Sequence, residues 1–170
     1  IGTYPRLPNE GLVHLMDRNM RRFIPLSYTE EEIEFARKIR ETLPEEPVSE
    51  KVLADEVLPP SRAVGGSNDN GDVSWITPFI SVRGGGYALG DWSHSWQRTS
   101  MAASSIGHKA MIAMTKVLSV SVLDLMVRPG LRAEVRKEFE EKTEGFVYRA
   151  NIPQARNSLV LLGKSARMKR

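Results

Sequence analysis

The most apolar stretch of the chain covers residues 106–127, and it limits the possible folds more than any other feature of the sequence. A run of this length is long enough to cross a membrane. Its charged or titratable residues are His108, Lys109, Lys116 and Asp124. Charged groups at such depths favour a helix in the core of a soluble domain over a membrane span. We therefore predict a long helix over residues 100–127 that is buried inside the protein.

Further helices are predicted on both sides of this stretch from capping signals. Asn9 is a suitable N-cap for a first helix, which Pro25 would end. Thr29 and Glu32 match the capping box that opens a second helix. After a Pro-Gly break, apolar residues recur at every fourth position within residues 131–144. This spacing indicates a last helix.

Two segments between these helices have the composition of β-strands. Residues 73–82 are rich in β-branched and aromatic residues, with a break near Pro78, and a short second strand is predicted around Tyr87. We therefore predict an α/β fold in which the long helix packs on a mixed sheet flanked by helices. The sheet would be incomplete within this chain. Its exposed edges and apolar faces would require a partner, either another polypeptide segment or a second copy.

The composition excludes several classes of protein. The chain has no cysteine, which excludes a disulfide framework and thiolate metal sites and fits a reducing compartment such as the cytoplasm. The N-terminal residues lack the basic start and apolar run of a signal peptide. The net charge is only +3, and much of the excess lies in the basic tail at residues 154–170, so no nucleic-acid partner is expected. Residues 44–61 are rich in Pro and Glu and are predicted to form a surface linker.

The segment AVGGSNDNGDVSW, residues 63–75, gathers small polar and acidic residues around three glycines and ends on an apolar pair. A flexible linker explains the glycines but not the apolar end, so this loop is a candidate site, although Asn and Asp are also ordinary turn formers. An EF-hand is excluded because Thr77 stands where a bidentate carboxylate is required. The glycine-rich phosphate motifs are absent. A hydrolase triad of Ser67, His94 and Asp72 would lack a nucleophile elbow.

His94 is the candidate ligand or catalyst among the three histidines, since the other two lie within predicted helices and are interpreted as structural. It lies between Trp92 and Trp96, whose indoles would give the imidazole a rigid, water-poor surrounding. Without thiolates, metals of the zinc or manganese kind are held by imidazole and carboxylate groups. Asp69 and Asp72 are therefore possible ligands, or they cap turns.

Three blocks of the sequence resemble a known family. They are GGSNDNGDVSWITP, GDWSHSWQ and SSIGHKAMIAMTKVL, in this order. They are similar to the C-terminal part of the aminobenzoyl-glutamate hydrolase B-subunit group, a branch of the metal-dependent amidohydrolases and peptidases of the aminoacylase–carboxypeptidase superfamily. The resemblance implies a zinc-exopeptidase-like catalytic domain. Residues 9–153 would form its C-terminal half, and residues 1–8 a possible exit strand from a lid or dimerisation domain.

The same resemblance implies a site with two divalent metal ions, commonly zinc or manganese, that activate a water for attack on an amide carbonyl. It makes His94 a metal ligand, and it places Gly66, Ser67 and Asp69 near the substrate. Asp72 would support the loop. The family's other ligands and its glutamate base lie in an N-terminal half that nothing in this chain matches. The chain by itself is therefore expected to be inactive, with no catalytic residue of its own.

As the family implies, the complete protein would cleave N-acyl or N-aroyl amino acids or small peptides and would form homo-oligomers. Its partners would be the N-terminal half of the same catalytic domain and a small amide substrate, without nucleic acid or membrane. The alternative is a non-catalytic interaction module, or a degenerate homologue that keeps the fold and has lost the site. A His-x-Asp or Cys-x-His pair with a Glu-Glu pair upstream would decide for the enzyme.

Overall fold

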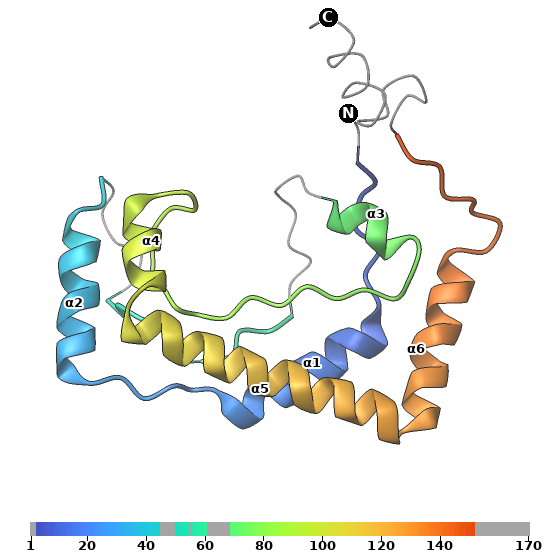
Figure 1. Cartoon of the computed structure of the whole chain (residues 1–170), viewed down its shortest axis with the longest axis horizontal. Coiled ribbons are helices and arrows are strands. Elements are labelled where there is room, and N and C mark those ends of the chain that lie inside the picture. The colour runs from blue at the N-terminus through green and yellow to red at the C-terminus, as the bar shows by residue number, and fades with distance from the viewer. Residues whose placement is uncertain (1–2, 45–49, 55, 61–68, 152–170) are drawn as a thin grey trace, which may run out of the picture.

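The computed structural model describes residues 3–44, 50–54, 56–60 and 69–151. Its helices are α1 (Glu10–Phe23), α2 (Glu30–Glu41), α3 (Asn70–Ser74), α4 (Trp96–Ala102), α5 (Ser105–Val127) and α6 (Pro129–Lys142). They form an open U (Figure 1). The base is made by α5 and α1, one arm by α2 and α4, and the other arm by α6 and α3. Helix α3, which lies within the candidate segment 63–75, and helix α4, which follows His94, therefore lie on different arms.

The predicted caps of the first two helices are confirmed. The Asn9 side chain accepts a hydrogen bond of 3.0 Å from the backbone N–H of Leu12. The capping box of α2 is complete, because the Thr29 N–H donates to Glu32 Oε2 (2.8 Å) and the Glu32 N–H donates to Thr29 Oγ1 (3.3 Å). These bonds satisfy N–H groups that have no partner inside a helix. Local sequence therefore determines where both helices begin.

The predicted α/β fold with a mixed sheet is wrong for the described residues, which contain helices and no strand. Their one bridge is antiparallel, between Leu53 and Ala88, next to a 2.8 Å bond from the Leu89 N–H to the Val52 carbonyl. Residues 78–82, the second part of the strand predicted over residues 73–82, lie in a segment that crosses from one arm to the other without regular structure (Figure 1). A strand requires a neighbour for its backbone groups, and β-branched residues favour strands only where such a pleated surface exists. The described segments supply no such neighbour.

The beginning of the predicted strand is helical instead. Val73 and Ser74 belong to α3, in which the Val73 N–H donates to the Asp69 carbonyl at 3.2 Å and the Thr77 N–H donates to the Val73 carbonyl at 3.1 Å. Asp and Asn at the start of this segment favour such a turn of helix. Here the short-range backbone bonds outweigh the β-propensity of the residues that follow.

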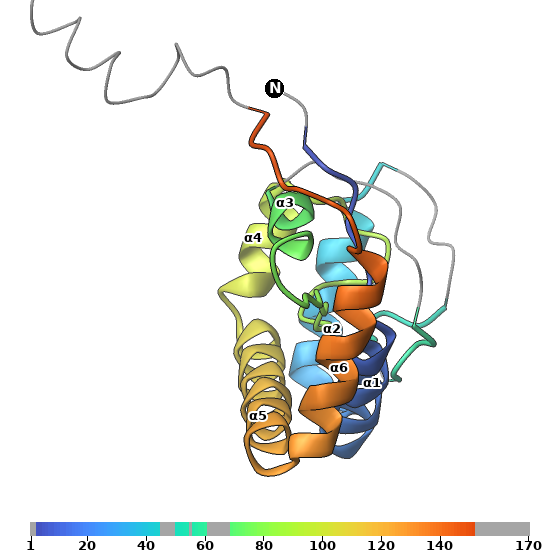
Figure 2. The same ribbon diagram turned by 90° about the vertical axis from the view of Figure 1, so that its right-hand side faces the viewer.

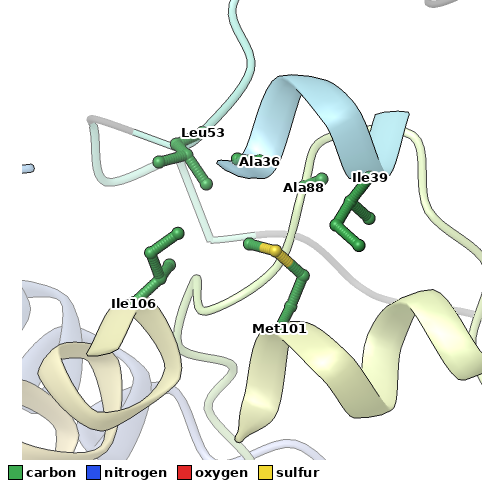
Figure 3. Packing of buried hydrophobic residues seen from close by; sticks show 6 residues of the cluster. All are labelled: Ala36, Ile39, Leu53, Ala88, Met101 and Ile106. Carbon is green, nitrogen blue, oxygen red and sulfur yellow. The ribbon is translucent and has the colours of Figure 1, made fainter. Parts of the chain in front are cut away.

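The core is divided between the two ends of α5. At the N-terminal end, Met101 and Ile106 meet side chains from α2 and from the segments on either side of the bridge (Figure 3). The cluster consists of Ala36, Ile39, Leu53, Ala88, Met101 and Ile106. At the C-terminal end, Leu12 and Leu15 of α1 pack with Val135 of α6. Leu53 lies in the segment predicted to be a surface linker, and it is buried.

The predicted helix over residues 100–127 is broken into α4 and α5. Gly107 allows the tight junction between them, since a Cβ atom there would lie 2.4 Å from the carbonyl oxygen of Ala102. The absence of a side chain allows the backbones of the two helices to approach each other. The Ser104 hydroxyl then donates to the Met101 carbonyl at 2.7 Å, which satisfies a C-terminal carbonyl of α4.

Helix α5 is buried on one face only, so the prediction of a buried core helix is wrong for its other face. Its buried residues recur at helical spacing and are Ile106, Ala110, Ala113, Val117, Ser121 and Asp124. They form the inner face, against which α1 packs: the Asn19 side-chain amide donates to Ser121 Oγ (2.9 Å) and to Asp124 Oδ2 (3.1 Å). The opposite face is exposed and apolar. Among the described residues, α5 is the one helix long and apolar enough to span a membrane.

Candidate functional site

His94 lies on a tight turn that leads into α4. Ser95 is the N-cap of this helix: its Oγ accepts from the Arg98 N–H at 3.1 Å and donates to the Trp92 carbonyl at 2.7 Å. His94 has a φ of 63° and is the one described residue other than glycine in the left-handed region. Residues rarely adopt this conformation unless the surroundings impose it, and such outliers are frequent at functional sites. The turn therefore presents the imidazole from a constrained backbone.

An ion pair between Asp91 and Arg98 joins the start of the turn to α4. Arg98 Nη2 donates to Asp91 Oδ1, and the Asp91 side chain is completely buried. The Arg98 guanidinium also lies over the Tyr87 ring, 3.6 Å from its centroid, which is a cation–π contact. Burial raises the pKa of the Asp91 carboxyl, and the charge and hydrogen bond of Arg98 oppose that rise. The sequence indicates Asp91 only as a neighbour of His94; its pairing seven residues ahead arises because the turn brings Arg98 back.

The expectation of a water-poor surrounding for His94 is wrong. His94 is exposed, and the side chains of Trp92 and Trp96 are 52% and 58% exposed. Proximity in sequence to two tryptophans therefore does not shield the imidazole from solvent. The turn therefore displays two indoles and one imidazole on the surface of the described structure.

The polar loop is described only from Asp69 onward; Gly66 and Ser67 lie outside the described residues. Asp69 occupies the N-cap position of α3, but its side chain makes no capping hydrogen bond and is exposed. Asp72 is partly buried and accepts a 3.0 Å hydrogen bond from the Tyr148 hydroxyl. Burial is the main cause that raises the pKa of Tyr148, followed by this hydrogen bond. Asp72 thus attaches α3 to the segment after α6.

The residues around Asp72 hold the N-terminal segment. A Cβ atom on Gly71 would lie 1.9 Å from the Tyr4 carbonyl oxygen, so only glycine allows this approach. Ser74 Oγ accepts from the Leu7 N–H at 2.9 Å and donates to the Gly71 carbonyl at 2.5 Å. The Trp75 indole donates to the Pro5 carbonyl at 2.7 Å. The GDVSW sequence therefore binds an extended strip of backbone, residues 4–7.

Four aromatic rings complete this contact. Tyr4, Trp75, Phe146 and Tyr148 have centroid separations of 4.4–6.1 Å. The Tyr4 hydroxyl donates to the Arg149 carbonyl at 3.0 Å. We call these rings and the hydrogen bonds of Gly71, Asp72, Ser74 and Trp75 the α3 clasp. It joins residues 4–7, α3 and residues 146–149, and so fixes the point at which the polar loop enters α3. Local sequence patterns do not reveal the clasp, because its partners lie about 70 residues away on either side.

The described residues do not form a metal centre by themselves. No group of three or more His, Asp or Glu side chains suited to holding an ion occurs among them. His94 precedes α4 on one arm of the U, whereas Asp69 and Asp72 lie at α3 on the other (Figure 1). The structure therefore does not bring the predicted ligand and the predicted carboxylates together within this chain.

One other acidic side chain is strongly perturbed. Glu32 accepts from Lys109 Nζ (2.6 Å) and from Ser105 Oγ (2.6 Å), besides its capping bond. The hydrogen bond with Lys109, followed by that with Ser105, lowers the pKa of Glu32 to about 2. Lys109 also donates to the Ser27 carbonyl. These contacts attach α2 to α5 and leave no free oxygen pointing toward a ligand, so we interpret the cluster as structural.

Comparison with known proteins identifies a relative with a related sequence. The chain is 28% identical over 173 residues to the B-subunit of p-aminobenzoyl-glutamate hydrolase from Escherichia coli (strain K12). The resemblance predicted from the three sequence blocks is confirmed. The alignment covers 87% of this chain and 36% of the relative, so the chain spans about a third of that protein's length. No protein-family model matches the chain, and no solved structure matches it.

Proposed function

We propose that this chain is part of a metal-dependent amidohydrolase that cleaves N-acyl or N-aroyl amino acids or small peptides of the aminobenzoyl-glutamate type. The observation that carries the proposal is the similarity over 87% of the chain to a hydrolase named for p-aminobenzoyl-glutamate. The constrained, exposed His94 on its ion-paired turn gives independent support, because a ligand side chain must be both accessible and held in place.

The roles proposed for individual residues follow the family pattern. His94 would donate one nitrogen to a zinc or manganese ion, as one of two metals in the complete site. Gly66, Ser67 and Asp69 would contact the substrate, and Asp72, through the α3 clasp, would support the loop that carries them. Since the described residues contain no group that could hold an ion unaided, we assign no step of the reaction to this chain alone.

The proposal therefore includes a second set of residues outside this chain. We propose that the N-terminal half of the same catalytic domain supplies the remaining ligands and the general base, that the whole assembles as a homo-oligomer, and that it works in the cytoplasm. The 36% coverage of the relative supports a larger functional unit. The purified chain is then expected to have no hydrolase activity.

The experiment is a hydrolysis assay of the purified chain on p-aminobenzoyl-glutamate with added Zn²⁺ or Mn²⁺. We expect no product above the buffer rate. Hydrolysis that disappears in a His94→Ala variant would contradict the proposal, because the chain would then contain a complete site. In a longer protein that includes this chain, His94→Ala should lower metal content and activity together. Loss of activity with both metals retained would make His94 a substrate contact.

A non-catalytic interaction module is the second candidate, and the exposed apolar face of α5 favours it. The intact mass of the polypeptide from its native source separates the two. A mass well above that of 170 residues, with upstream metal ligands in the sequence, supports the hydrolase. A mass equal to that of this chain supports the interaction module.

A further inference from the structure

The outer face of α5 carries seven of the fourteen large apolar side chains that are exposed among the described residues. Its exposed side chains are Met111, Ile112, Leu118, Val122, Leu123, Met126 and Val127, each between 45% and 71% exposed. They are separated by four, seven or eleven residues, as in 111, 118, 122 and 126 or 112, 123 and 127, so they lie along one side of the helix. A helix of 23 residues is about 34 Å long. The apolar surface therefore runs along most of the base of the U.

No described segment covers this face. Helix α1 packs on the opposite side of α5, where Asn19 binds Ser121 and Asp124. In Figure 1 α5 lies in front of α1. In Figure 2 α5 lies at the left edge of the lower part of the molecule, and α1 and α6 both lie to its right. Soluble proteins expose single apolar side chains commonly, but contiguous patches of this kind mark interaction sites.

The chemistry of the face indicates an apolar occupant. Between residues 110 and 127 the charged residues are Lys116 and Asp124, and Asp124 is buried on the inner side. Lys116 is exposed and can extend its amine to solvent beside a bound surface. A face with one positive charge cannot bind a polyanion through several ion pairs. It is suited to burial against another apolar protein surface.

We infer that the outer face of α5 is the docking surface for the part of the hydrolase that this chain does not contain. The inference rests on the proposed function. The alignment leaves 64% of the relative unmatched, since 36% is covered, so a large polypeptide surface is available to bind here. Covering a helix face of this length removes on the order of 1,000 Å² from water when both sides are counted, which is about the lower limit for a specific interface.

Two other occupants fit the structure less well. If α5 left α1 to cross a bilayer, the hydrogen bonds of Asn19 to Ser121 and Asp124 would be lost, and Asp124 would enter hydrocarbon. A second copy would cover the face, but it would then leave the unmatched part of the hydrolase without this apolar surface to bind. Docking of the unmatched part leaves the contacts of α1 with α5 intact.

The test uses co-expression of the 170-residue chain with a probe, the polypeptide formed by the residues of the E. coli relative outside the alignment. Size-exclusion chromatography with light scattering measures complex formation. Co-expression of the probe with the matched portion of the E. coli protein establishes that the probe can bind. The wild-type chain is expected to form a complex, and Val122→Lys should weaken it at least tenfold. Val147→Lys is the matched control, because Val147 is exposed but lies away from α5.

A second measurement does not depend on the folding of the Lys variant. The chain has no cysteine, so Ser119→Cys on the outer face introduces a single thiol. The probe should slow alkylation of this thiol at least tenfold. It should not slow alkylation of Ala133→Cys, an exposed position on α6.

Each of the other outcomes overturns the inference. Equal binding by Val122→Lys and wild type, without protection of Ser119→Cys, places the interface elsewhere. Self-association that Val122→Lys abolishes, without a probe complex, assigns the face to a second copy. If no probe complex forms and the chain binds phosphatidylcholine vesicles in a way that Val122→Lys abolishes, the face is assigned to a membrane. If the chain stays a monomer and binds neither probe nor vesicles, the face has no partner. None of these measurements depends on hydrolysis. A complex that forms but does not hydrolyse the substrate would therefore contradict the proposed function and leave the docking surface intact.

Discussion

At the residue scale, single polar contacts attach segments that are distant in the sequence. Glu32 links α2 to α5 through Lys109 and Ser105, and Gly71 allows α3 to contact residues 4–7. Both residues lie within motifs that the sequence suggested for other reasons, a capping box and a candidate binding loop. Their long-range contacts are additional to the local roles and can be tested separately.

Glu32→Gln should lower the free energy of unfolding by about 1–3 kcal/mol at pH 7, because it removes the charged partner of Lys109. The pKa of Glu32 is depressed to about 2 from an ordinary 4.5, so its contribution is present above pH 4.5 and is lost as pH falls toward 2. Urea unfolding between pH 7 and pH 3 should therefore be less pH-dependent in the variant. Glu34→Gln is the control, since Glu34 pairs with Arg37 at an exposed site. An equal loss of stability in Glu32→Gln and Glu34→Gln would contradict the conclusion that Glu32 attaches α2 to α5.

Gly71→Ala should destabilise the protein by roughly 1–3 kcal/mol, because its methyl group would displace the Tyr4 backbone. The displacement should also change the environment of Trp75, whose indole binds Pro5, and so alter its fluorescence. Gly130→Ala on α6 meets nothing within 4 Å and is expected to be neutral or stabilising. If thermal unfolding showed Gly71→Ala to be as stable as Gly130→Ala, the clasp would not constrain the N-terminal segment.

At the element scale, the turn before α4 depends on the pair formed by Asp91 and Arg98. The carboxylate is buried and the guanidinium is partly exposed. Removing the cation therefore leaves a buried charge whose desolvation nothing opposes. The turn that presents His94 should accordingly be sensitive to pH once Arg98 is replaced.

Arg98→Gln should destabilise the chain at pH 7.5 by about 1–3 kcal/mol, a value reduced for the partial exposure of Arg98. Burial already raises the pKa of Asp91, and loss of Arg98 removes the opposing effect. A carboxyl with a raised folded-state pKa costs stability as pH rises above its ordinary pKa, so the loss should be smaller at pH 4.5. Urea unfolding at the two pH values gives the comparison, with the exposed Arg136→Gln as control. A loss that grows toward acid pH would show that the pair does not behave as described.

At the scale of the whole molecule, the two core clusters lie at opposite ends of α5, which is the one described helix that contributes to both. An open U with two separate clusters is expected to open in parts, because each arm depends mainly on its own cluster. The uncovered face of α5 lies between them along the base.

Ile106→Ala and Leu15→Ala should each cost about 2–4 kcal/mol, since both side chains are buried. The two variants should accelerate amide hydrogen exchange in different helices. Ile106→Ala should raise exchange mainly in α2 and α4, and Leu15→Ala mainly in α6. Uniform acceleration in both variants would mean that the molecule unfolds as one unit.

The sequence by itself determined the features that depend on neighbouring residues. Asn9, Thr29 and Glu32 satisfy backbone groups within three positions, so the starts of α1 and α2 follow from local chemistry. The three sequence blocks were likewise sufficient to predict the resemblance to the hydrolase.

Only the tertiary structure decided the features that depend on distant partners. Residues 78–82 have strand composition, but a strand exists only beside another strand, and none of the described segments pairs with them. Three further features depend on which distant segments the fold brings together. They are the exposure of Trp92 and Trp96, the pairing of Asp91 with Arg98, and the three segments joined at α3. The apolar run likewise predicted a long helix here, whereas the uncovered face of α5 depends on which surfaces are near it.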